Sequence, residues 1–94
     1  MTRFIIDVRT PQEFAARHIE GAINIDFHDP QFNTQMMEFP KDTELVVYCN
    51  AGGRAGRAKT RLKELGFSDV TSYGIMGASA ATGTQVLYQT AQRD

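Results

Sequence analysis

The chain has 94 residues, of which 41% are hydrophobic and 22% charged, a composition typical of a globular domain and unlike that of disordered, collagen-like or disulfide-rich chains. At this length we expect residues 1–94 to form a single domain. The formal net charge of −1 lacks the basic excess of nucleic-acid binders, and the sequence has no run of about 20 apolar residues to span a bilayer. We therefore expect no nucleic acid and no membrane among its partners.

The first residues bear on localisation. A secretory signal peptide needs a basic region and a longer apolar segment than Phe4-Ile5-Ile6, which Asp7 interrupts. We expect a cytoplasmic protein, or a periplasmic one if a leader has been removed from the chain.

Short β-branched runs alternate with segments of helical periodicity, which is typical of parallel α/β units. The first strand is predicted at residues 4–8. The sequence Thr10-Pro11-Gln12-Glu13 is a capping box with proline at the first helical position, so a helix is expected to begin at Pro11 and to end before Gly21. Residues 22–25 are predicted to form a second short strand.

The middle of the chain contains the clearest strand. Within residues 28–42, the spacing of Phe32, Met36 and Met37 predicts a short helix. Residues 45–48 are continuously apolar, as in strands that are covered on both faces, and this strand ends at Cys49.

A second well-defined helix is predicted at residues 55–65, with Gly66 at the position of a left-handed terminator. A fourth strand follows at 69–73, and residues 85–92 are expected to form a closing helix. These elements predict an α/β fold with a mainly parallel sheet of about four strands and helices on both faces.

The segment Cys49-Asn50-Ala51-Gly52-Gly53-Arg54 lies between the clearest strand and the following helix, at the carboxyl end of the sheet, where α/β proteins bind ligands. Gly52 and Gly53 permit backbone angles closed to other residues, so consecutive N–H groups can surround Cys49 as an anion-binding nest. The positive end of the helix and a charge from Arg54 or Arg57 add to this field. The pattern favours a Cys49 thiolate over the thiol and predicts a nucleophile.

The alternative is a buried structural cysteine beside glycines that only mark a loop. As the single cysteine, Cys49 forms no internal disulfide. Two histidines and one cysteine at these spacings make no recognisable zinc set, so we expect no metal site. We expect His18 to have a structural role and His28 to be exposed. The convergence of glycines, arginine and helix start on one sulfur favours the nucleophile.

Three separated motifs resemble those of the rhodanese (thiosulfate sulfurtransferase) domain, and in particular its short single-domain phage-shock type. In chain order they are Ile6-Asp7-Val8-Arg9-Thr10-Pro11-Gln12-Glu13-Phe14, His18-Ile19-Glu20-Gly21-Ala22-Ile23-Asn24-Ile25 and Cys49-Asn50-Ala51-Gly52-Gly53-Arg54-Ala55. Residues 65–70 match that family's turn into its next strand. Residues 73–77 depart from the family pattern, in which a double glycine and a later tryptophan are often found.

The resemblance implies a three-layer rhodanese-like fold and a ping-pong sulfur transfer that needs no cofactor. A Cys49 thiolate would take the outer sulfur of thiosulfate or of a persulfide donor, form a persulfide, and pass the sulfur to cyanide or to a small-molecule or protein thiol. Residues expected to bind the small anionic donor are Asn50, Ala51, Gly52, Gly53, Arg54 and Arg57. Asp7 and Arg9 are expected to organise the loop.

Two rival functions differ from this interpretation. The first rival is a phosphatase or arsenate reductase. Phosphatases of related fold have five residues between cysteine and arginine, whereas Cys49 and Arg54 enclose four, a smaller cradle that suits a sulfur atom. The other rival is a catalytically inert rhodanese-like module that binds a partner or senses oxidants. Inert members often lose the cysteine, so its presence here favours an enzyme.

The roles of two arginines stay open at this stage. Arg54 either binds the donor or holds the loop by pairing with a carboxylate such as Asp7, and we favour the second role. Arg57, one turn into the helix, either helps to bind an anionic donor or is only solvated.

Overall fold

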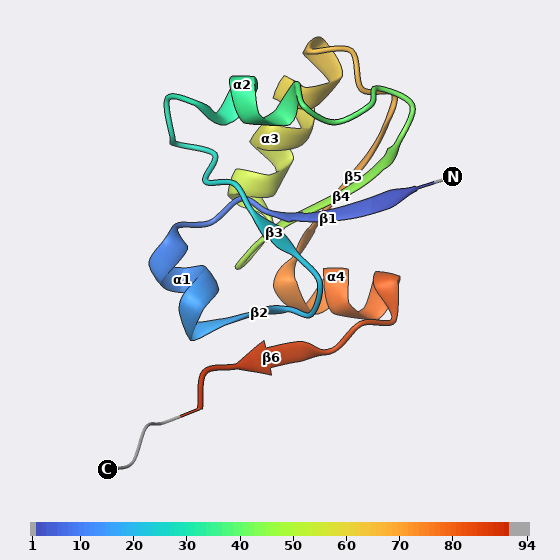
Figure 1. Cartoon of the computed structure of the whole chain (residues 1–94). Helices are drawn as coiled ribbons and strands as arrows, with labels where there is room; N and C mark the ends of the chain where they lie inside the picture. Colours follow the sequence, from blue (N-terminus) through green and yellow to red (C-terminus); the bar gives the residue numbers. More distant parts are fainter. Residues whose placement is uncertain (1, 91–94) are drawn as a thin grey trace.

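The computed structural model describes residues 2–90 and contains a central four-stranded sheet (Figure 1). The strand order is β3-β1-β4-β5, and all neighbouring pairs are parallel. The carboxyl ends of the strands therefore lie along one edge, and the predicted α/β fold is confirmed. The strands are β1 (Arg3–Asp7), β3 (Ile23–Asn24), β4 (Glu44–Cys49) and β5 (Asp69–Gly74).

Helices cover both faces of this sheet, as predicted (Figure 1). α2 (Phe32–Met36) and α3 (Gly53–Glu64) lie on one side, and α4 (Ile75–Thr82) lies on the other. α1 (Pro11–Ala16) follows β1 at the carboxyl edge of the sheet. The chain after each of β1 and β4 thus enters a helix at the edge where Cys49 lies.

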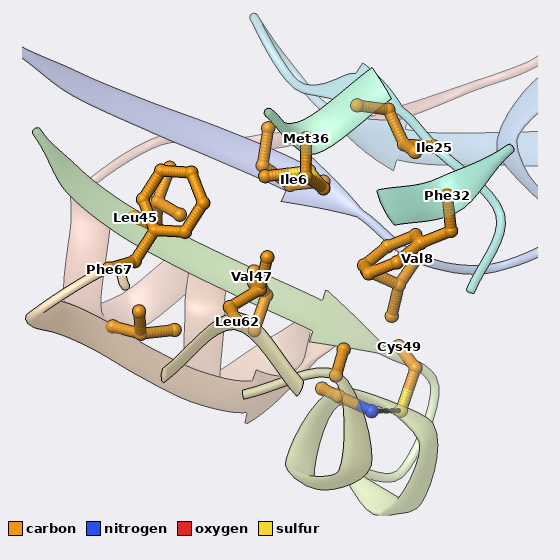
Figure 2. Packing of buried hydrophobic residues seen from close by; sticks show 13 residues of the cluster. Ile6, Val8, Ile25, Phe32, Met36, Leu45, Val47, Cys49, Leu62 and Phe67 are labelled. Carbon is orange, nitrogen blue, oxygen red and sulfur yellow. Dashed lines mark hydrogen bonds between the residues drawn. The ribbon is translucent and has the colours of Figure 1, made fainter. Parts of the chain in front are cut away.

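Strand β4 divides the hydrophobic core between the two faces, because successive side chains of a strand point to opposite sides. Leu45, Val47 and Cys49 pack in the cluster beneath α2 and α3 (Figure 2). Val46 and Tyr48 belong to the second cluster, which includes buried residues of α4. The strand is apolar throughout because both of its faces are covered.

Helix α1 is shorter than predicted. It begins at Pro11 behind a complete Thr10–Glu13 capping box, as expected, but it ends at Ala16 and does not continue toward Gly21. The next residues form β2 (Arg17–Ile19), which pairs antiparallel with β6 (Val86–Tyr88) in a separate two-stranded sheet. Pairing with a strand from the far end of the chain overrides the local helical pattern.

The C-terminal part also differs from the prediction. The closing helix expected at 85–92 is wrong, because residues 86–88 form β6, while residues 91 and 92 lie outside the described residues. The helix of this region is α4, which ends at Gly83 in the left-handed conformation, with φ of 69°. Val86 packs against the cluster that includes β2 and α4, so tertiary contacts decide the conformation here.

The other predicted helices are present. α2 forms one short turn within the 28–42 segment, and α3 begins at Gly53, slightly before its predicted start. Gly66 follows α3 with φ of 106°, in agreement with its predicted role as terminator. Within residues 2–90, no helix has the length and apolar character required to cross a bilayer.

Candidate active site

Cys49 is the last residue of β4 and lies beside the first turn of α3 (Figure 2). It is 2% exposed, and its Sγ accepts hydrogen bonds from the backbone N–H groups of Gly52, at 3.0 Å, and Ala55, at 3.3 Å. Both donors lie at the positive end of a 12-residue helix, where N–H groups lack helical partners. These donors stabilise negative charge on the sulfur.

Gly52 gives the loop its sharp bend. It is the N-cap of α3 and has φ of 104°, in the left-handed region that favours glycine, and this conformation aims its N–H at Sγ. Gly53 has no positive φ and is already the first residue of the helix. The special backbone angles expected for both glycines are therefore found only at Gly52.

Arg54 is paired with Glu13, so the Asp7 partner suggested from the sequence is wrong. Its Nη1 donates to Oε1 of Glu13 at 2.8 Å and its Nη2 to Oε2 at 3.0 Å, a two-bond fork. This guanidinium lowers the pKa of Glu13 to about 2. Glu13 reaches the loop because the capping box with Thr10 fixes its side chain at the start of α1. The ion pair joins α1 to the first turn of α3.

Asp7 instead pairs with Arg9, two residues along the same segment. Nη2 of Arg9 donates to Oδ2 of Asp7 at 2.7 Å, and Nε donates to Oδ1 at 3.0 Å. Both residues are buried, with exposed fractions of 0% and 1%. Burial disfavours the charged guanidinium, but hydrogen bonding and attraction to Asp7 exceed that effect, so the pKa of Arg9 is raised. This buried ion pair fixes the position of the Arg9 guanidinium next to the loop.

Asn50 connects the two ion pairs. Its Oδ1 accepts a hydrogen bond from Nη1 of Arg9 at 2.9 Å, and its Nδ2 donates to Oε2 of Glu13 at 2.9 Å. Asn50, the residue next to Cys49, is therefore held by two groups: the Arg9 guanidinium and the Glu13 carboxylate, which also binds Arg54. Sequence patterns suggested each of these groups except Glu13, which the sequence presented only as a helix cap.

Gly74 is a second site residue that the sequence did not reveal. It ends β5, next to Cys49 in the strand register, and a Cβ on it would lie 2.7 Å from the carbonyl oxygen of Asn50. The same oxygen accepts a hydrogen bond from the N–H of Ile75 at 3.2 Å. Only glycine permits this close approach between β5 and the loop. The sequence feature that could have indicated it is the glycine at position 74, which lies within residues 73–77, where the chain departs from the family pattern.

The remaining candidates lie at the surface. Ala51, Gly53 and Arg57 are exposed around the loop, in positions open to a ligand. His18 stacks on the ring of Phe14, with centroids 3.9 Å apart, and is held in the scaffold. No cluster of His, Cys, Asp and Glu side chains within residues 2–90 could hold a metal ion.

Comparison with known protein families gives a match to the Rhodanese-like domain over residues 1–79, which include every residue of this site. The chain belongs to the rhodanese-like family. The resemblance seen in the three sequence motifs is thereby confirmed.

Several relatives of this rhodanese-like domain are named as sulfurtransferases. Thiosulfate sulfurtransferase PspE of Escherichia coli (strain K12) is 38% identical over 69 residues, which cover 73% of this chain and 66% of the relative. Thiosulfate:glutathione sulfurtransferase of Saccharomyces cerevisiae is 31% identical over 80 residues, covering 73% and 58%. The Arabidopsis thaliana mitochondrial protein HIGH ARSENIC CONTENT 1 is 39% identical over 79 residues, covering 73% and 47%. The chain thus spans about half to two thirds of the length of these relatives.

Solved structures show the same fold. A rhodanese with anions from E. coli superposes with a TM-score of 0.69 at 35% identity, covering 80% of this chain and 89% of that one. A rhodanese-like domain from Anabaena has a TM-score of 0.79 at 21% identity and covers 98% of both chains, which supports the fold alone.

Proposed function

We propose that this rhodanese-like domain is a sulfurtransferase that carries sulfane sulfur as a persulfide of Cys49. The observation that carries the proposal is the pair of backbone N–H groups held 3.0 and 3.3 Å from Sγ at the start of α3. The names of the E. coli and yeast relatives support sulfur transfer as the general reaction. A cysteine with only a packing role requires neither these donors nor the ion pairs around its loop.

In the first half-reaction, the Cys49 thiolate attacks the outer sulfur of thiosulfate. A bond forms between Sγ and that sulfur while its bond to the sulfite sulfur breaks, and sulfite leaves with the electron pair. The N–H groups of Gly52 and Ala55 stabilise the thiolate before the attack and the persulfide charge after it.

In the second half-reaction, a nucleophilic acceptor attacks the outer sulfur of the persulfide, and Cys49 leaves as the thiolate. With cyanide the product is thiocyanate, and with a thiol it is a new persulfide. These 94 residues contain no second cysteine to take the sulfur, so the acceptor is another nucleophile.

The neighbouring side chains have distinct roles in this proposal. Arg54 fixes the loop conformation by binding Glu13, and Asn50 does so by binding Glu13 and Arg9. This corresponds to the loop-holding role that the sequence favoured for Arg54. Ala51 and Gly53 are small and exposed, so they place no bulky side chain in the way of an anionic donor that approaches the loop, and the exposed Arg57 contributes positive charge nearby.

Intact-protein mass spectrometry after incubation with thiosulfate tests the proposal. We expect the mass to increase by one sulfur atom, the added sulfur to be removed by cyanide as thiocyanate, and both results to disappear in Cys49→Ser. An unmodified wild-type protein would support the inert module, and hydrolysis of a phosphate ester without sulfur transfer would support the phosphatase.

A further inference from the structure

A hollow of about 340 Å³ lies beside α3, outside the network that holds the loop. Its lining combines an aromatic ring, two arginines and an acidic side chain: Phe27, Arg57, Thr60, Arg61 and Glu64. This volume is at the lower end of the range of small-molecule sites, about 300 to 1,000 Å³. The hollow therefore suits part of a small ligand.

Helical periodicity connects this hollow to the active-site loop. Arg54, Arg57 and Arg61 are separated by three and four residues, so they lie along one side of α3. Arg54 belongs to the loop network, and the two others continue the row of positive charge away from it. The lysines Lys59 and Lys63 occupy another side of the same helix.

The two arginines of the hollow differ in whether their guanidinium groups already contact other side chains. Arg61 is already oriented, because its guanidinium lies 5.1 Å from the centroid of the Phe27 ring and its Nη1 donates to Oδ1 of Asn33 at 3.1 Å. Arg57 is exposed, and within residues 2–90 its side chain makes no ion pair. One guanidinium is thus fixed in place, while the other has its hydrogen-bond donors available for an anion.

We propose that this hollow binds the charged end of a peptide-like thiol, the acceptor of the sulfur held on Cys49; the inference rests on the proposed function. Paired guanidinium groups match a carboxylate, and Glu64 in the same lining matches an ammonium group. A carboxylate and an ammonium on the same carbon occur in a free amino acid such as cysteine and at the γ-glutamyl end of glutathione, whereas an ordinary peptide carries them at opposite ends. Cyanide has neither group, so it makes no carboxylate fork or ammonium contact in this hollow and responds only to the net charge, which the lysine control removes equally.

The dimensions agree with this assignment. Given a rise of about 1.5 Å per residue, the α-carbons of Arg57, Arg61 and Glu64 lie about 6, 12 and 16 Å along the axis from the start of α3. A peptide of two or three residues extends over roughly 7 to 10 Å. Side chains on a helix lean toward its N-terminus, so the guanidinium groups of Arg57 and Arg61 extend toward the loop from these α-carbons. Such a molecule can therefore place its thiol at the loop while its carboxylate lies beside Arg57 and Arg61.

The decisive measurement starts from enzyme already loaded with persulfide sulfur, so that donor binding plays no part. Its discharge is followed with glutathione or with cyanide, in the wild type and in Arg57→Ala, Arg61→Ala and Lys63→Ala. We expect the glutathione-to-cyanide ratio of kcat/KM to fall about tenfold in each arginine variant, the effect of losing roughly one charge-assisted hydrogen bond. In Lys63→Ala, which removes the same charge from another side of α3, the ratio should not change.

A binding experiment separates this inference from the proposed function. S-methylglutathione, which cannot accept sulfur, is titrated into Cys49→Ser and followed by NMR. Chemical-shift changes at residues of α3, with a Kd that rises about tenfold in Arg57→Ala, support the hollow as the site, even if no persulfide ever forms. A ratio of kcat/KM that is unchanged in both arginine variants, or S-methylglutathione shifts confined to another face, would overturn the inference while leaving sulfur transfer intact.

Discussion

Among single residues, Glu13 has the widest influence on the candidate site. Its two carboxylate oxygens bind Arg54 and Asn50, and the residue also caps α1 through Thr10. One side chain thereby ties both ends of the segment 50–54 to a helix that precedes it by a third of the chain. Its charge is essential to this role, because a guanidinium fork requires an anionic partner.

The low pKa of Glu13 gives a testable pH dependence. Arg54 lowers this pKa from 4.5 to about 2, so the folded state favours the ionised carboxylate. The resulting stability is fully present above about pH 4.5 and is lost as the pH falls toward about 2. We expect the difference in free energy of unfolding between the wild type and Glu13→Gln, measured with urea, to shrink over this interval. We also expect the rate of persulfide formation at neutral pH to fall about tenfold.

Glu38→Gln is the matched control, since it removes the same charge from an exposed position just beyond the C-cap of α2. A pH-dependent loss of equal size in this variant would assign the effect to overall charge and contradict the role of Glu13.

Substitution of two glycines gives a second prediction for single residues: one change should lower the free energy of unfolding and the other should raise it. Gly74→Ala places a Cβ 2.7 Å from the Asn50 carbonyl oxygen, so we expect a loss of roughly 1–3 kcal/mol in stability and slower persulfide formation. Gly56 lies inside α3, and a Cβ there meets nothing within 4 Å. Gly56→Ala should therefore stabilise the protein by about 0.5–1 kcal/mol. Thermal and urea unfolding measure both; equal effects would mean that the contact at Gly74 is unimportant.

Among the secondary-structure elements, the β2–β6 pair stabilises the site through hydrogen bonds of β2 with Arg9 and Tyr48. The carbonyl oxygen of Arg17 in β2 accepts a hydrogen bond from Nη2 of Arg9 at 2.6 Å, and the N–H of Ile19 donates to the Tyr48 hydroxyl at 3.0 Å. β6 completes this strand and packs Val86 against the second core cluster. The C-terminal strand thus stabilises the backbone that holds Arg9.

Truncation of a β6 side chain tests this support. We expect Val86→Ala to reduce the free energy of unfolding by about 1 kcal/mol, because it removes partly buried apolar surface. Tyr88→Ala, at a side chain that is 64% exposed in the same strand, should change it by less than about 0.5 kcal/mol. If urea unfolding gives equal losses for the two variants, β6 contributes through its backbone alone.

The same elements show which parts of the fold could be predicted. Strands β1 and β4 are marked by apolar runs, β5 by its β-branched and aromatic residues between Gly66 and Gly74, and α3 by its apolar face and Gly66, so local patterns were sufficient. β2 and β6 have three residues each and form only because they meet each other, and no local pattern carries that information. α4 was missed because its sequence of small residues has little amphipathic character.

For the molecule as a whole, the candidate site is an edge where distant segments meet. The loop position and Cys49 could be predicted, because the carboxyl end of a central parallel strand and a helix start both follow from local sequence. The partner of Arg54 could not, since Asp7 and Glu13 are both carboxylates near the end of β1. Only their side-chain directions decide: Asp7 is buried with Arg9, and Glu13 faces the loop.

This arrangement of the loop also has a kinetic consequence. The contacts that fix it, from Arg9 to Asn50 and from Glu13 to Arg54, each join residues 41 positions apart. During synthesis, the amino-terminal partners leave the ribosome well before the loop exists, and ordering contacts of such separation requires closure of a long chain segment. The paired residues of β1 and β4, such as Phe4 and Leu45, are also 41 positions apart, and the loop contacts need the carboxyl ends of these two strands in place. We infer that the cradle around the sulfur closes after the central strands have paired. Removing the Glu13 contact should then accelerate unfolding and leave the refolding rate nearly unchanged.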